Sequence, residues 1–138
     1  MTDHARGWCS LRLRFDEREL ELLRGAEQLR GSAIARSSGR DELRAALQLA
    51  KAGQKVGRSA PGGSVSLDES ELGLLVEALQ FAAREVPAAT RVNGTDVQRR
   101  AAVMAAFPEL VEKGSWRSFG LGRELEALAA RLSAARDS

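Results

Sequence analysis

The sequence predicts a mostly helical α+β domain with a tandem strand–helix–helix repeat, a small two- or three-stranded sheet and a C-terminal amphipathic helix. Two observations support this prediction. Residues 15–29 recur as residues 67–81, with eight identical positions and a period of about 52 residues. Each copy also follows a segment typical of a β-strand and opens with the same pair of helix-capping residues. The repeat describes an architecture and does not identify a chemical activity.

The first unit, residues 9–53, begins with a strand. Between Cys9 and Phe15, apolar and polar residues alternate, which is the period-two pattern of a strand with one face in water. Asp16 follows directly, and Glu19 comes three residues later, at the spacing of a capping box. We therefore expect a strand that passes straight into a helix.

The second unit, residues 64–114, repeats these features. A short strand at 64–67 is followed by Asp68 and Glu71, which form the same capping pair. The next helix is apolar over most of its circumference at 74–83, a pattern typical of a helix that is enclosed on several sides. It is therefore either the central helix of the domain or part of a dimer interface.

A second helix is expected in each unit. In the first unit it spans residues 41–52, with Leu43, Leu47 and Ala50 on one stripe. Gly53 stands directly after this helix, where a left-handed cap is common, so the helix is expected to end there.

Proline and glycine mark the other boundaries. Pro87 is expected to end the first helix of the second unit, and residues 96–107 are expected to form its second helix. The Gly-rich residues 54–63 predict a flexible linker between the units, and residues 1–7 a flexible N-terminus.

Residues 115–138 close the single domain. Residues 123–128 resemble residues 18–23, so this end is either a truncated third copy with its own strand or a lone amphipathic helix. The strands of the two units are expected to pair with each other around a pseudo-twofold axis, or to form a small sheet together with residues 116–121.

Composition places the chain among globular proteins. Its 138 residues are 43% hydrophobic and 29% charged, which suits one domain with a single core. No apolar run approaches the roughly 20 residues that a membrane span requires. Cys9 is the single cysteine and cannot form an internal disulfide, and the N-terminus lacks an apolar signal-peptide core. We therefore expect a cytoplasmic protein without membrane contact.

Groups for catalysis or metal binding are scarce. His4 and Cys9 are the only residues of their types, too few for a His-dependent nucleophile or a tetrahedral zinc site. The acids Asp68, Glu69 and Glu71 are explained by the helix start that they cap. Neither common glycine-rich phosphate loop pattern occurs. The sequence predicts no catalytic residue, no metal site and no cofactor.

The net charge is only +2, but basic residues gather in the first half of the chain. Residues 24–58 contain eight Lys and Arg against three acids. Such a cluster suits contacts with phosphates or other anions, although the chain has no Tyr and few aromatic residues for base stacking. A solvated basic face is the alternative. The candidate contacts are Arg30, Arg36, Arg40, Arg44, Lys51, Lys55 and Arg58.

A second candidate surface lies in the C-terminal segment. Its leucines are spaced by four, three and four residues, as in a short coiled-coil stripe. Trp116 precedes them, either as an exposed anchor for a partner or as a lid over the edge of the core. The candidate contacts for a partner or a dimer are Trp116, Leu121, Leu125, Leu128 and Leu132.

Together these features favour a small, non-enzymatic bacterial adaptor or regulatory protein that binds another protein and forms a homodimer. The alternative is a nucleic-acid-binding accessory protein that uses the basic segment 30–58. A second alternative is an enzyme whose site the sequence does not reveal.

Overall fold

The computed structural model describes residues 10–35, 39–90, 97–113 and 117–137. Two short strands and six helices form in these ranges. In chain order they are β1 (Leu11–Arg14), α2 (Glu17–Ala35), α3 (Arg40–Gly57), β2 (Ser64–Leu67), α4 (Glu69–Ala89), α5 (Val97–Ala106), α6 (Glu109–Lys113) and α7 (Arg117–Asp137). The predicted flexible N-terminus at 1–7 lies outside the described residues, as does Cys9. The expected class, mostly helical α+β, is confirmed.

The strands β1 and β2 pair with each other in an antiparallel sheet, with Leu11 opposite Leu67 and Leu13 opposite Val65. This pairing is one of the two arrangements that the sequence allowed. The other arrangement, in which residues 116–121 add a strand, is wrong, because the chain from Arg117 onward is part of α7. The prediction of a truncated third copy with its own strand therefore fails from Arg117 onward.

Both predicted capping boxes form. The backbone N–H of Glu71 donates to Asp68 at 2.8 Å, and the Glu71 carboxylate accepts from the Asp68 N–H at 3.0 Å. Asp16 and Glu19 make the same reciprocal pair of hydrogen bonds at the start of α2. Each box satisfies two backbone donors, one at the cap and one in the first helical turn, and so fixes where the helix begins.

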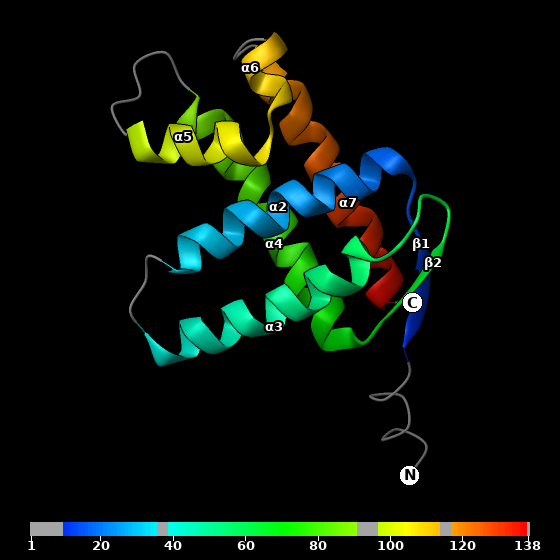
Figure 1. The fold of residues 1–138 in the computed structure, drawn as a ribbon. Coiled ribbons are helices and arrows are strands. Elements are labelled where there is room, and N and C mark those ends of the chain that lie inside the picture. Colours follow the sequence, from blue (N-terminus) through cyan, green and yellow to red (C-terminus); the bar gives the residue numbers. More distant parts are fainter. Residues whose placement is uncertain (1–9, 36–38, 91–96, 114–116, 138) are drawn as a thin grey trace.

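The helices cross one another in two layers. Figure 1 shows α2 and α3 running side by side across α4 and α7, with the two strands at one end of the molecule. The helix α4 packs against α7, α2, α3 and α5, and Leu72 and Leu79 are fully buried. The apolar helix at 74–83 is therefore the central helix of the domain, which was one of the two expected roles.

The helix α4 continues past Pro87, which corrects the expectation that it ends there. It runs to Ala89 with Pro87 inside its last turn, and the Thr90 hydroxyl donates to the Val86 carbonyl at 2.7 Å. A proline this close to a helix end removes the backbone N–H that would bond the Ala83 carbonyl. Gly122 of α7 approaches this carbonyl so closely that an added Cβ would lie 3.4 Å from its oxygen.

The helix α3 runs through Gly53 to Gly57, so the expected stop at Gly53 is wrong. Gly53 instead lies inside the helix beside the Glu27 side chain of α2, whose carboxyl carbon would be 2.7 Å from an added Cβ and which would have to move to admit one. The first four residues of the predicted linker, 54–57, are consequently helical. The order strand, helix, helix does occur twice along the chain, while its origin by duplication stays a prediction.

Candidate interaction surface on helix α3

The structure places the four C-terminal leucines in the core. Leu121, Leu125, Leu128 and Leu132 are all buried, and α7 makes its most extensive contacts with α4 of the same chain. A partner or second copy would have to displace α4 to reach them, so their burial does not agree with a contact surface. Trp116 lies outside the described residues, and Phe119 just after it is 70% exposed.

The seven basic candidates do not form one site. Arg30 donates to Glu77 on α4 at 2.7 Å, and its guanidinium lies 5.0 Å from the centre of the Phe81 ring. Lys55 donates to Glu71 of α4 at 2.8 Å. These two cations therefore join helices to each other. Arg36 lies outside the described residues.

The other cations of α3 form one exposed row. Arg40, Arg44 and Lys51 are exposed and form no ion pair with another described residue. At 3.6 residues per turn, these three cations fall within an arc of about 40° of the helix circumference. The row is about 17 Å long, from the 1.5 Å rise per residue. It gives α3 a positive face that the chain itself does not neutralise.

An apolar stripe lies next to this row. Leu43 is 54% exposed, Leu47 is 73% exposed, and Ala50 is exposed on the same side of α3. The face that α3 buries is formed by Leu49, Ala52 and Val56. The stripe predicted from the sequence is therefore the outer face of the helix. Two leucines one turn apart, exposed beside unpaired cations, form the clearest candidate interaction surface; we call this surface the α3 outer face.

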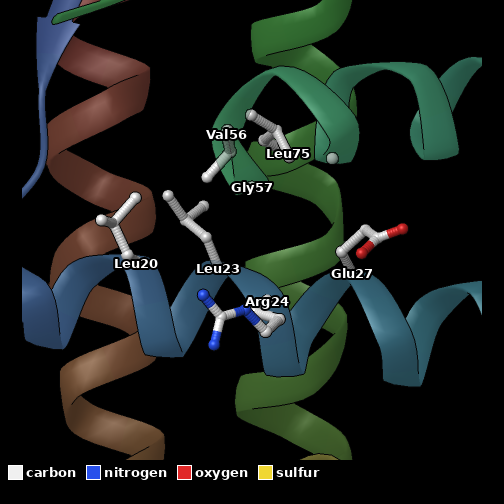
Figure 2. A pocket seen from close by; sticks show the side chains of 8 residues that line it. Leu20, Leu23, Arg24, Glu27, Val56, Gly57 and Leu75 are labelled. Carbon is white, nitrogen blue, oxygen red and sulfur yellow. The ribbon is translucent and has the colours of Figure 1, made fainter. Parts of the chain in front are cut away.

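A small cavity lies between α2 and α3. Figure 2 shows Leu23 and Val56 pointing toward each other across this space, with Glu27 near one end. The cavity volume of about 20 Å³ suffices for a single water molecule. No described residue forms a hydrogen bond or ion pair with Glu27, and burial raises the pKa of its carboxyl group. The cavity is too small for a ligand. The charged form of Glu27 is unfavourable at its edge, because the carboxyl group is partly buried there.

We expect Glu27→Gln to raise the free energy of unfolding at neutral pH by about 0.5 kcal/mol, in the range of single stabilising substitutions. A raised pKa in the folded state means that this carboxyl group favours folding below its unfolded pKa, and that the benefit is lost as pH rises through the folded pKa. The gain should therefore shrink in acid. Urea unfolding at several pH values measures it, and Glu21→Gln, an exposed acid on the same helix, should show no such gain.

Sequence reasoning missed a cluster of ion pairs that joins α2, α6 and α7. Arg18 donates to Glu109 at 2.7 Å and to Glu124 at 2.9 Å, and Arg117 donates to Glu124 at 2.6 Å and lies 3.2 Å from Glu109. Each carboxylate therefore contacts both guanidinium groups. We call these four residues the four-charge cluster.

The four-charge cluster shifts the pKa values of Arg18 and Glu124 so that both charged forms are favoured. Hydrogen bonding to Arg18 holds the pKa of Glu124 below its usual value, against the opposing effect of burial. The hydrogen bond to Glu124 in turn raises the pKa of Arg18. Because the cluster has no net charge and each carboxylate pairs with both guanidinium groups, it fits a structural role that fixes α6 and α7 against the start of α2.

Comparison with known proteins adds no assignment. The chain matches no protein-family model, and no curated protein or solved structure is significantly similar to it. Among the described residues, no three Cys, His, Asp or Glu side chains gather in an arrangement that could hold a metal ion. Over the same ranges, each helix is either too short or too polar to cross a membrane.

Proposed function

We propose that this protein is a non-enzymatic adaptor that binds an acidic amphipathic helix of another protein through the α3 outer face. The observation that carries the proposal is the exposure of Leu43 and Leu47 on a helix whose opposite face is in the core. An amphipathic helix of a partner binds such an apolar surface with side chains that are spaced about one helical turn apart.

The charge next to the leucines selects the partner. Arg40, Arg44 and Lys51 run along one side of the apolar stripe and lack acidic partners among the described residues. A partner helix with leucines on one stripe and glutamates beside it would cover the apolar surface and pair these cations. Apolar contact then supplies affinity, and the charges supply orientation.

The same charges argue against a second copy of this chain as the partner that covers the α3 outer face. In a twofold pair the α3 outer face would meet the same face of the other copy, so the row of Arg40, Arg44 and Lys51 on one copy would approach the same row on the other, whether the helices ran parallel or antiparallel. Like charges at an interface cost binding energy. The homodimer expected from the sequence also relied on leucines that are buried. The proposed partner is therefore a different chain.

Nucleic-acid binding is a second candidate, favoured by the row of three unpaired cations on α3. Phosphate contacts by such a row give a strongly salt-dependent affinity. The adjacent leucines are less suited to this role than aromatic side chains, which stack on bases. The two candidates differ in whether Leu43 and Leu47 contribute to binding.

The double variant Leu43→Ser/Leu47→Ser should weaken binding of a synthetic acidic amphipathic peptide by about a hundredfold or more, since two buried interface anchors at about 2 kcal/mol each together contribute about 4 kcal/mol. Fluorescence anisotropy of the labelled peptide measures this. Both leucines are exposed, so the variant should unfold at the same urea concentration as the wild-type protein.

Val111→Ser provides a matched control, because Val111 is 68% exposed on α6, away from α3. It should leave peptide affinity unchanged. A peptide with lysines in place of the glutamates should not bind. Equal binding of the two peptides, or equal losses in the two variants, would contradict the proposal. Salt-sensitive oligonucleotide binding that survives the double leucine substitution would favour the second candidate.

A further inference from the structure

We infer that the pocket between the end of α3 and strand β2 binds a phosphate group, a site separate from the proposed protein-binding surface. The pocket has a volume of about 280 Å³ and is open to solvent on one side. It is lined by Lys55, Arg58, Ser59, Ser64, Val65 and Ser66. Five of these six residues carry a cationic group or a hydroxyl group, the groups that hold oxyanions in proteins.

The pocket runs along the free edge of the sheet. Successive residues of a strand point to opposite faces, so a pocket lined by three consecutive residues, 64–66, must follow the edge of β2. The other edge of β2 is occupied by β1. An unpaired strand edge presents backbone N–H groups, which add donors for a phosphate to the serine hydroxyls.

Two more arginines belong to the same surface. The register places Arg12 opposite Ser66 and Arg14 opposite Ser64, so their side chains share one face of the sheet with the two serines. Directly opposed side chains start about 5 Å apart, within reach of a flexible arginine. Both arginines are exposed, and neither forms an ion pair with another described residue.

The net positive charge around the pocket favours an anion as its ligand. Lys55 is already paired with Glu71 at 2.8 Å, so the unpaired positive charge comes from Arg58, Arg12 and Arg14. The C-terminal end of α3 opposes an anion with about half a unit of negative charge. Three arginine charges outweigh this. One guanidinium group can donate two parallel hydrogen bonds to two oxygens of the same phosphate. This geometry favours phosphate over a monovalent anion such as chloride.

The pocket exceeds one phosphate in size, so the phosphate belongs to a larger group. That group is either a free phosphomonoester or the backbone of a nucleic acid. Titration of the isotope-labelled protein with pyrophosphate, a 5′-mononucleotide and a single-stranded oligonucleotide, followed by amide NMR shifts, distinguishes these sources. We expect shifts centred on residues 58–66. Tighter, salt-sensitive oligonucleotide binding identifies a nucleic acid, and equal affinity for the mononucleotide identifies a phosphomonoester.

The variants Arg58→Ala and Arg12→Ala should each weaken phosphate binding about tenfold, the usual effect of losing one hydrogen bond between charged groups. Arg84→Ala removes an exposed arginine from α4, outside the pocket, and should leave affinity unchanged. All three positions are exposed and should leave the urea midpoint unchanged. Absence of shifts at 58–66 with every phosphate probe, or equal weakening by Arg84→Ala, would overturn the inference.

Discussion

The variant Leu125→Ala should unfold with about 2–5 kcal/mol less free energy than the wild-type protein, the usual cost of truncating a buried leucine. Leu125 is fully buried on α7, and the contact of α7 with α4 is the most extensive one between helices in the described part of the chain. Its removal leaves a cavity that two long helices cannot easily close. Urea unfolding followed by circular dichroism measures the loss.

This substitution also separates core packing from assembly. The molar mass in light scattering should be the same for Leu125→Ala and for the wild-type protein, because the fold of the single chain already buries this side chain completely. Glu126→Ala, an exposed neighbour on α7, should cost less than about 0.5 kcal/mol. A variant that lowers the molar mass while keeping its unfolding free energy would instead place a dimer interface at this stripe.

The variant Arg18→Ala should lower the free energy of unfolding by about 1.5–3 kcal/mol, because it removes charged hydrogen bonds and leaves two carboxylates facing each other. Glu109 and Glu124 would then share Arg117 alone. Glu109 is the less exposed of the two carboxylates that Arg18 contacts, so its charge loses more stabilisation by the change. Urea unfolding at neutral pH and low salt measures the effect.

The pH dependence tests the same cluster. Because the pKa of Glu124 is lowered in the folded state, its contribution is complete above the unfolded pKa and is lost as pH falls through the folded pKa. The difference between wild-type protein and Arg18→Ala should therefore shrink in acid. Arg123→Ala removes an exposed arginine of α7 and is the matched control. Equal losses for Arg18→Ala and Arg123→Ala at neutral pH would contradict the structural role of the cluster.

Local patterns predicted the start of each unit correctly. Alternation and capping residues depend on neighbours within a few positions, so the strands at β1 and β2 and the reciprocal bonds of Asp16 and Asp68 could be expected from sequence. Gly53 and Pro87 misled because each carries only a local preference for a helix end. The helix α3 continues past Gly53 to Gly57, and α4 continues past Pro87 to Ala89.

Contacts between residues far apart in the chain could not be predicted from the sequence. Segments 18–23 and 123–128 were recognised as similar, but nothing in that similarity indicated that Arg18 and Glu124 bond to each other. Helical periodicity likewise tells which residues share a face and not what covers it. The leucine stripe of α7 is covered by α4, whereas the stripe at Leu43 and Leu47 is left exposed.

Mapping the acidic amphipathic peptide onto the isotope-labelled protein by amide NMR shifts tests the proposed function most directly. We expect the largest shifts in α3, around Leu43 and Leu47, and no shifts in α7. Largest shifts between Leu121 and Leu132, with α3 unchanged, would contradict it and return the interaction surface to the C-terminal helix.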